Sequence, residues 1–118
     1  MRPSVLIVDD QPDFREAASA LLSADGFDVV GAVEDGPAAL AAVKRLRPAV
    51  VLLDLQLPGG LDGFGVAERI AEIAEPPDVV LISGRPERTY GSRVAAAPAR
   101  GFIAKSVLSG KALAEVLG

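Results

Sequence analysis

Residues 50–60 read VVLLDLQLPGG, and this stretch decides the fold that the rest of the chain must adopt. Four uniformly apolar residues, 50–53, are followed by Asp54 and then by a loop rich in proline and glycine. A short apolar run that is bounded by turn residues is typical of a strand covered on both faces. The stretch therefore predicts a buried strand whose carboxyl end presents an acidic side chain.

Similar apolar runs recur along the chain and alternate with helical patterns. The predicted strands are Val5–Val8, Asp28–Val33, Val50–Leu53, Val79–Ile82 and Phe102–Ala104. Between them, apolar residues recur at the spacing of helices that lie on a core. These stripes are Phe14, Ala17, Ala18, Leu21 and Leu22; Ala39, Leu40, Val43 and Leu46; Val66, Ala67, Ile70, Ile73 and Ala74; and, within Ser109–Leu117, Leu113, Val116 and Leu117. This alternation predicts a doubly wound parallel sheet of five strands with helices on both faces.

Turn residues and caps mark the ends of these helices. Asp25-Gly26 ends the first helix, Asp35-Gly36-Pro37 begins the second, and Pro76-Pro77 ends the third. Asp35 and Asp62 are assigned to capping, because each stands just before a helical stripe. The segment Gly84–Arg100 is interrupted by glycine and proline, so we expect its helix, the fourth, to be short or mobile.

The composition of the 118-residue chain excludes several classes of protein. Half of the residues are hydrophobic, so we expect one domain over residues 1–118. There is no Cys and no His, so chemistry must depend on carboxylates, hydroxyls and lysine. The net charge of −4 argues against a nucleic-acid surface. No apolar run is long enough for a membrane span, and the opening MRPSVLIVDD lacks a signal-peptide pattern, so we expect a cytoplasmic protein.

The candidate site residues are polar or small side chains that directly follow four different predicted strands. They are Asp9 and Asp10 after the first strand, Asp54 after the third, Ser83 and Gly84 after the fourth, and Lys105 after the fifth. In an open parallel sheet the carboxyl ends of the strands meet at one edge, and ligands bind there. We therefore expect these residues to form one site.

Three carboxylates at one edge repel one another and require positive charge nearby. Two unit charges 4 Å apart interact by about 4 kcal/mol at an effective dielectric near 20. Lys105 supplies one positive charge, and a divalent cation that prefers oxygen ligands, Mg²⁺ or Mn²⁺, supplies the rest. A carboxylate such as Asp54 is a competent nucleophile for phosphorus, and Ser83 can hydrogen-bond a phosphoryl oxygen. The residue types therefore indicate phosphoryl transfer.

Each of these residues also has a plainer interpretation. Asp9-Asp10 before Gln11 and Pro12 has the composition of a helix N-cap, and Ser83 also suits a cap. A lysine after a strand is by default a solvated surface residue. The joint placement of the residues after four different strands favours the functional interpretation.

Four motifs together resemble the receiver domain of two-component response regulators, over essentially the whole chain. They are VLIVDDQPDFR at 5–15, VVLLDLQLPGG at 50–60, LISGR at 81–85 and GFIAKS at 101–106. The resemblance implies a flavodoxin-like fold with strand order 2-1-3-4-5 and about five helices. It implies a phosphorylation-activated switch that accepts a phosphoryl group, with Mg²⁺, from a histidine kinase, a phosphotransfer protein or a small phosphodonor. Such a switch catalyses only its own phosphorylation and dephosphorylation.

The resemblance also implies a role for each site residue. The implied catalytic residues are Asp54, which is the phosphoacceptor, Lys105 and Ser83. The implied metal ligands are Asp9, Asp10, Asp54 and the backbone carbonyl of Gln56. The implied switch residues are Ser83 and Phe102, and the residues expected to tune the lifetime or access of the phosphoryl group are Gln56, Gly84 and Arg85.

Several features of the chain differ from the usual form of this family. The loop LPGGLDGF at 57–64 is about one residue longer, and Ser106 stands where many receivers have a proline with a cis peptide bond.

From Arg85 to Lys105 five positive residues stand against one negative residue, and we expect this face to bind an acidic partner, an output partner or a second receiver. The ending, residues 101–118, resembles receivers that precede a DNA-binding domain.

Two other functions remain open at this stage. A degenerate receiver would act only as a phosphorylation-independent protein-binding module. A Mg²⁺-dependent phosphatase-like hydrolase also uses an aspartate nucleophile, but it requires an Asp-x-Asp pair after the first strand, whereas Asp9 and Asp10 are adjacent. A nucleotide or flavin binder is disfavoured, since no glycine-rich phosphate loop follows that strand.

Overall fold

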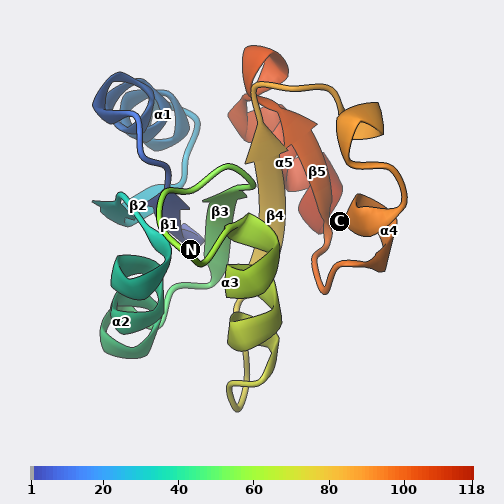
Figure 1. The fold of residues 1–118 in the computed structure, drawn as a ribbon. Helices are drawn as coiled ribbons and strands as arrows, with labels where there is room; N and C mark the ends of the chain where they lie inside the picture. Colours follow the sequence, from blue (N-terminus) through green and yellow to red (C-terminus); the bar gives the residue numbers. More distant parts are fainter. Residues whose placement is uncertain (1) are drawn as a thin grey trace.

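The computed structural model describes residues 2–118. Met1, where the expected domain and the opening segment begin, lies outside the described residues. Five parallel strands form one sheet in the order β2-β1-β3-β4-β5, which confirms the predicted doubly wound arrangement (Figure 1). The strands are β1 (Ser4–Val8), β2 (Asp28–Val33), β3 (Val50–Asp54), β4 (Asp78–Ser83) and β5 (Gly101–Ala104). The helices are α1 (Pro12–Ala24), α2 (Gly36–Leu46), α3 (Gly63–Ala71), α4 (Arg93–Ala96) and α5 (Gly110–Leu117), with 3₁₀ turns η1 (Glu87–Tyr90) and η2 (Lys105–Val107).

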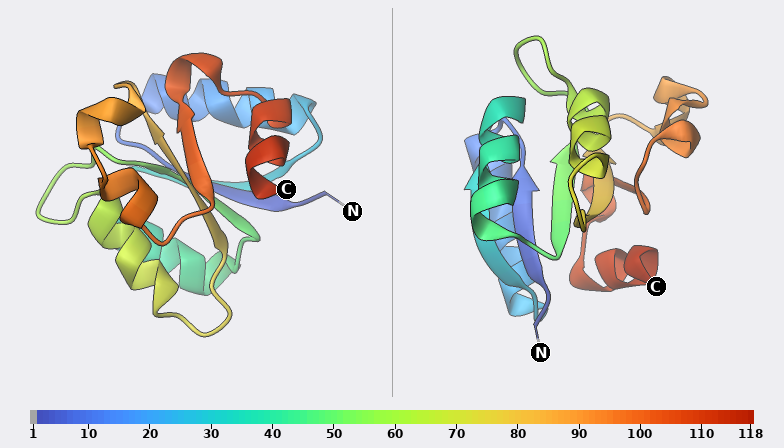
Figure 2. Two further views of the ribbon diagram at one scale, coloured as in Figure 1. Left: turned by 90° about the vertical axis from the view of Figure 1, so that its right-hand side faces the viewer. Right: turned by 90° about the horizontal axis from the view of Figure 1, so that it is seen from below.

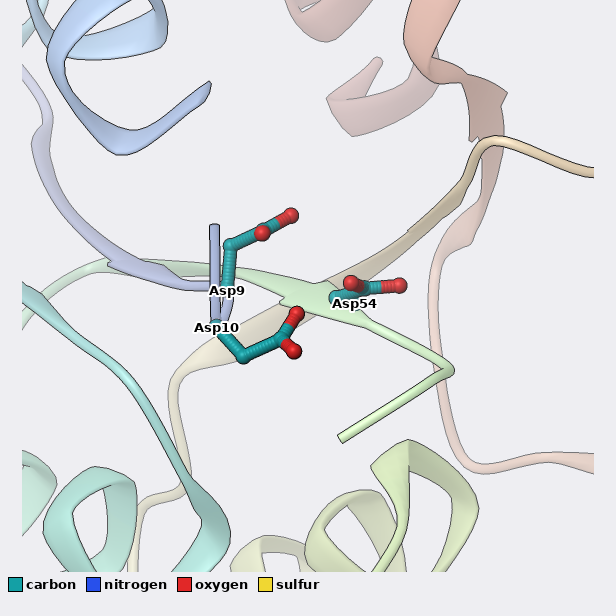
Figure 3. A group of neighbouring side chains, drawn as sticks. All are labelled: Asp9, Asp10 and Asp54. Atoms are coloured by element: carbon teal, nitrogen blue, oxygen red, sulfur yellow. The ribbon is translucent and has the colours of Figure 1, made fainter. Parts of the chain in front are cut away.

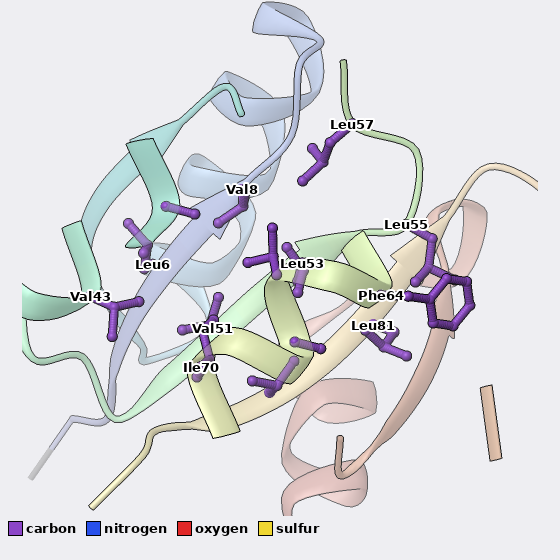
Figure 4. Packing of buried hydrophobic residues seen from close by; sticks show 14 of the residues in the cluster. Leu6, Val8, Val43, Val51, Leu53, Leu55, Leu57, Phe64, Ile70 and Leu81 are labelled. Atoms are coloured by element: carbon purple, nitrogen blue, oxygen red, sulfur yellow. The ribbon is translucent and has the colours of Figure 1, made fainter. Parts of the chain in front are cut away.

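Helices cover both faces of the sheet. α1 and α5 lie on one face, and α2 and α3 lie on the other, as the left view of Figure 2 shows. Alternate side chains of a strand point to opposite faces, so Leu52 and Leu53 of β3 belong to separate cores, and both are fully buried. The core beneath α2 and α3 includes Leu6, Val51 and Ile70 (Figure 4). The inner strands β1, β3 and β4 are therefore buried along nearly their whole length, whereas the edge strands β2 and β5 are only partly covered.

Side-chain caps begin three of the helices. Asp35 accepts a hydrogen bond from the backbone N–H of Ala38 at 2.9 Å, and Asp62 accepts one from Gly65 at 2.9 Å. Both predicted capping residues are thus confirmed. Ser109 caps α5 in the same way.

Two contacts fasten the last helix to the rest of the molecule. Asp25, at the end of α1, accepts a hydrogen bond from the N–H of Gly110 at 2.8 Å, and a Cβ on Gly110 would lie 2.3 Å from that of Asp25. At the other end of α5, Arg100 donates to the carbonyl of Leu117 at 2.7 Å and pairs with Asp78 at 3.3 Å. Helix α5 is therefore held at both of its ends.

The buried stripe of α1 is narrower than predicted, and helix α3 is shorter than predicted. In α1, Ala17 and Leu21 are exposed, Leu21 by 38%, because a helix that lies on a sheet contacts it along a narrow line. Helix α3 ends at Ala71, so that Ile73 and Ala74 lie beyond it. The N–H of Ile73 bonds the carbonyl of Ile70 at 3.0 Å, which is the tighter turn that often ends a helix.

The chain between β4 and β5 has little regular structure, which confirms the prediction of a short fourth helix. Turn η1 and helix α4 span four residues each, and Gly91, with φ of 59°, separates them. No cis peptide bond occurs between residues 2 and 118, so the bond from Lys105 to Ser106 is trans. Within the same range, no helix has the length and apolar composition that crossing a membrane requires.

Candidate functional site

Three carboxylates gather at the carboxyl edge of the sheet. One oxygen from each of Asp9, Asp10 and Asp54 lies within 4.8 Å of the others (Figure 3). Strands β1 and β3 are parallel neighbours with Val8 opposite Leu53, so the residues that follow this pair emerge side by side. Asp9 is 0% exposed and Asp54 is 2% exposed, whereas Asp10 is exposed. The predicted convergence of acids from the first and third strands is therefore present in the structure.

Lys105 lies against two of these carboxylates. Its Nζ is 2.6 Å from Oδ2 of Asp9 and 3.2 Å from Oδ2 of Asp54, and its side chain is 15% exposed. The same Nζ donates to Oε1 of Gln11 at 3.4 Å and lies 4.5 Å from the ring centroid of Phe14. Residues from the loop between β1 and α1, from α1 and from β3 thus surround one ammonium group, which is not the solvated lysine of the plainer interpretation.

Burial controls the charge of the central carboxylate. The pKa of Asp54 is raised from 3.8 to about 6. Burial raises it most and the charge of Asp9 raises it as well, whereas the N–H of Gln56, which donates to Oδ1 of Asp54 at 3.0 Å, and the contacts with Lys105 lower it. Burial lowers the pKa of Lys105, but its contacts with the two aspartates outweigh this effect and hold the pKa above its usual 10.5. Lys105 therefore remains positive.

The residues of this edge fit a divalent cation. Oδ1 of Asp9 accepts the N–H of Gln11 at 2.8 Å, whereas its buried Oδ2 has no hydrogen-bond partner within residues 2–118, since the 2.6 Å contact with Lys105 is an ion pair without hydrogen-bond geometry. A buried carboxylate oxygen beside two more carboxylates is a donor set that suits Mg²⁺. Gln11, and neither aspartate, is the N-cap residue of α1. The capping interpretation of Asp9-Asp10 is therefore wrong.

Ser83 is the last residue of β4 and is completely buried. Its Oγ accepts a hydrogen bond from the N–H of Arg85 at 3.0 Å and shares a second, 2.5 Å long, with the hydroxyl of Tyr90. Within the described part of the chain, no hydrogen bond joins Ser83 to Asp54 or Lys105. Sequence reasoning did not single out Tyr90, and its only signal there was that it is the one tyrosine of the chain.

The other residues that the sequence singled out lie around this edge. Gln56, Gly84 and Arg85 are exposed, and a Cβ at Gly84 would meet no atom within 4 Å. Phe102 is half-buried and packs against the same core as Tyr90. The backbone N–H of Gln56 thus donates a hydrogen bond to the Asp54 carboxylate, and the space beside Gly84 is open.

The basic face from Arg85 to Lys105 is narrower than the sequence indicated. Lys105 belongs to the site, Arg93 lies 3.7 Å from Asp62, and Arg100 pairs with the half-buried Asp78 of β4. Of the five basic residues of this face, only Arg85 and Arg88 have no ion-pair partner within residues 2–118. The positive charge that is available to a partner is therefore that of two arginines rather than that of five basic residues.

Two supporting contacts were not predicted. Arg15 of α1 donates to the backbone carbonyl of Asp9 at 2.7 Å and so steadies the loop of the acidic pair. Gly63, the first residue of α3, packs directly on the strand end: a Cβ there would lie 2.3 Å from the carbonyl oxygen of Asp54 and 2.6 Å from Cα of Leu55. Both contacts join segments that are distant or loop-separated in the sequence, which is why no local pattern reports them.

A parallel five-stranded sheet that brings an acidic cluster, a buried serine and a lysine to its carboxyl edge defines the class of protein. The family model of the response regulator receiver domain matches residues 5–117. The chain therefore belongs to the receiver domains of two-component response regulators.

Individual relatives agree with this assignment. The signal receiver domain of NarL from Mycobacterium tuberculosis superposes with a TM-score of 0.88 at 34% identity, covering 99% of this chain and 98% of that domain. The positive alginate biosynthesis regulatory protein of Pseudomonas aeruginosa is 38% identical over 97% of this chain and 45% of its own length. The DNA-binding response regulator MtrA of Mycolicibacterium smegmatis is 42% identical over 69% of this chain and 35% of its own length. The chain thus spans half or less of the curated relatives that it matches.

Proposed function

We propose that this chain is a phosphorylation-activated switch in which Asp54 accepts a phosphoryl group from a histidine kinase, a phosphotransfer protein or a small phosphodonor. One observation supports this most strongly. The Nζ of Lys105 lies within 3.2 Å of the carboxylates of both Asp9 and Asp54, beside the third carboxylate of the cluster, that of Asp10. A nucleophile, a fixed cation and a cation-binding donor set therefore share one edge of the sheet.

The chemistry that fits this arrangement is a displacement at phosphorus. An oxygen of Asp54 attacks the phosphoryl group, the new bond forms an acyl phosphate, and the bond from phosphorus to the donor breaks, so that imidazole or acetate leaves with the electron pair. Lys105 balances negative charge that develops on the phosphoryl oxygens. Asp9, Asp10, Asp54 and the carbonyl of Gln56 would hold Mg²⁺, which would supply further positive charge beside those oxygens.

The protonation and burial of Asp54 set the conditions for this step. A carboxyl pKa of about 6 leaves Asp54 ionised, and hence nucleophilic, above that pH. Asp10 is the exposed member of the cluster, so we propose that the donor approaches from its side. Hydrolysis of the acyl phosphate by water returns the resting state, and we propose that the exposed Gln56 and Arg85 set its rate. Replacing both with alanine should change the lifetime of the phosphorylated chain.

Incubation with acetyl phosphate and Mg²⁺, followed by intact-protein mass spectrometry, tests the proposal. We expect the chain to gain the mass of one phosphoryl group, and we expect Asp54→Ala to gain none. Asp28→Ala removes an exposed aspartate of β2 and is the matched control, which should behave as the unmodified chain does. If Asp54→Ala gained the same mass as the control, Asp54 would not be the acceptor.

A second candidate, the phosphorylation-independent binding module, is favoured by the near-complete burial of Asp54. In that case neither the unmodified chain nor Asp28→Ala would gain mass, at any donor concentration or in the presence of any divalent cation. The same experiment therefore separates the two functions.

Partner binding is the remaining part of the proposal. We propose that the switch acts in the cytoplasm and that its activated form binds a second receiver or an acidic output partner through the face that carries Arg85 and Arg88. The absence of ion-pair partners for these two arginines between residues 2 and 118 supports this choice. Charge reversal at Arg88 should weaken self-association or partner binding, and sedimentation velocity with and without acetyl phosphate measures the first of these.

A further inference from the structure

The hydroxyl of Ser83 is already engaged, and neither of its partners is Asp54 or Lys105. It accepts the N–H of Arg85 at 3.0 Å and shares a hydrogen bond of 2.5 Å with Tyr90. A serine hydroxyl has one proton and two lone pairs. If Ser83 donates to Tyr90, its single proton is in use; if Tyr90 donates, both lone pairs of Ser83 are filled. In either case the bond to Tyr90 depends on the present orientation of the Ser83 side chain.

A phosphoryl oxygen on Asp54 can only accept hydrogen bonds. To bind it, Ser83 must turn its Oγ, which makes no hydrogen bond with Asp54 within residues 2–118, toward the neighbouring strand, where Asp54 pairs with Ile82. That orientation gives up the contact with Tyr90. The phosphoryl group and the tyrosine therefore compete for one serine hydroxyl.

Tyr90 is also an anchor of the segment from Gly84 to Ala96. Every other residue of that segment is exposed except Val94, which is buried. The ring of Tyr90 packs edge-on against that of Phe64 at a centroid distance of 5.8 Å, and Arg93 lies 4.1 Å from the centroid of the same Phe64 ring. Few side chains thus hold this segment, which stands beside β4 and β5 (orange in Figures 1 and 2).

We propose that Tyr90 is a positioning residue that acts through Ser83: it holds the Ser83 hydroxyl in the resting orientation, and the phosphoryl group on Asp54 takes that hydroxyl away and loosens the segment Glu87–Ala96. This inference rests on the proposed phosphorylation of Asp54. The resemblance to receivers implies that Phe102 of β5 is the aromatic switch residue coupled to Ser83. The inference adds a second aromatic residue, Tyr90 of η1, which contacts Ser83 directly. The chemistry at the strand end is thereby connected to an exposed surface.

Tyr90→Phe tests the inference, since it removes the hydroxyl and keeps the ring against Phe64. Trypsin reports the segment, because Arg88 and Arg93 are cleavage sites whereas Arg85 precedes a proline. In the unmodified chain we expect acetyl phosphate with Mg²⁺ to raise the cleavage rate at these arginines about fivefold, the effect of losing one hydrogen bond. In Tyr90→Phe we expect that rate to be raised without phosphodonor and to change less than twofold on its addition.

A second readout separates positioning from simple loosening. Without the competing hydroxyl, Ser83 is free for the phosphoryl group, so Tyr90→Phe should gain the phosphoryl mass from acetyl phosphate faster than the unmodified chain, again by about fivefold. The control is Thr89→Ala in the same turn, an exposed residue whose side chain makes no hydrogen bond within residues 2–118. We expect this variant to match the unmodified chain in both measurements.

The outcomes separate this inference from the proposed function. An unmodified chain that never gains mass contradicts the phosphorylation of Asp54, and with it the competition for Ser83. A chain that is phosphorylated normally, but whose cleavage and phosphorylation rates are the same in Tyr90→Phe as in Thr89→Ala, contradicts the role of Tyr90 alone.

Discussion

Asp54 is a charged residue in a position where burial opposes its charge. Its pKa of about 6 means that the folded state binds a proton more readily than the unfolded state, in which the pKa is close to 3.8. The contribution of this group to stability is fully present below pH 4 and is lost as the pH rises through 6. At neutral pH the resting protein therefore carries an unfavourable charge at its central site.

We expect Asp54→Asn to stabilise the chain at pH 7.5 without divalent cations by on the order of 1–3 kcal/mol, since a shift of one pKa unit corresponds to about 1.4 kcal/mol. Near pH 4, where Asp54 is protonated in the folded state, the difference should disappear. Urea unfolding at the two pH values in the presence of a chelator measures both effects. Asp28→Asn, at an exposed site, is the control, and an equal stabilisation at both pH values would contradict the explanation.

The site residues that sequence reasoning found are those that directly follow a strand. Asp9, Asp54 and Lys105 could be placed together from the sequence because the carboxyl ends of parallel strands share one edge. Tyr90 and Gly63 could not, because their contacts depend on how two loops fold back onto the sheet. No spacing rule within one segment reports such a contact.

The start of helix α3 packs closely against the strand end that carries Asp54. Helix α3 begins at Gly63, whose Cα lies so close to β3 that a Cβ would be 2.3 Å from the backbone oxygen of Asp54. Backbone cannot move aside as the end of a flexible side chain can. The absence of a side chain at this position therefore lets the helix start directly beside the proposed acceptor.

We expect Gly63→Ala to destabilise the chain by about 1–3 kcal/mol, the usual range for an added group in a packed site, and to slow the phosphorylation of Asp54. Gly60→Ala is the matched control in the same loop, because its Cβ would meet no atom within 4 Å and its backbone does not have a positive φ. Urea unfolding and the acetyl phosphate assay compare the two. Equal effects of the two substitutions would show that the close approach at Gly63 has no importance.

At the level of elements, the sequence predicted every strand and the order of helices, but not the limits of each helix. The apolar stripe after Phe64 continues to Ala74, yet α3 ends at Ala71, because a tight turn at Ile73 leads the chain toward β4. The margin of the α1 stripe at Leu21 remains in solvent. Periodicity reports which residues are apolar, and only packing decides how many of them find a partner.

At the scale of the whole molecule, the residues predicted a doubly wound sheet of five strands, and the resemblance to receivers supplied its order. The structure has that order, with β1, β3 and β4 inside and β2 and β5 at the edges. Neither the residue pattern nor the resemblance to receivers predicted that Ser83 contacts Tyr90. This contact depends on a segment that glycine and proline interrupt and that forms only short helical turns.

Mg²⁺ should stabilise the whole molecule, because a cation that binds only the folded state shifts the unfolding equilibrium by mass action. At a Mg²⁺ concentration about one hundred times its Kd, we expect the free energy of unfolding to rise by about 2.7 kcal/mol. The increase should be much smaller in Asp10→Ala and unchanged in Asp13→Ala, an exposed aspartate of α1 outside the cluster. Thermal unfolding with Mg²⁺ and with a chelator measures this, and an equal response in the two variants would exclude Asp10 as a ligand.

The central position of β3 in the sheet determines how slowly its backbone amides exchange with deuterium. Because this strand has neighbours on both sides and helices over both of its faces, its amides can exchange with deuterium only when the entire fold opens. Those of the chain around Tyr90 can exchange through local fluctuations, which are far more frequent. If Asp54 is the acceptor, as we propose, the phosphoryl group is attached to a strand that opens only with the whole fold, whereas its effect is carried by a surface segment that opens locally.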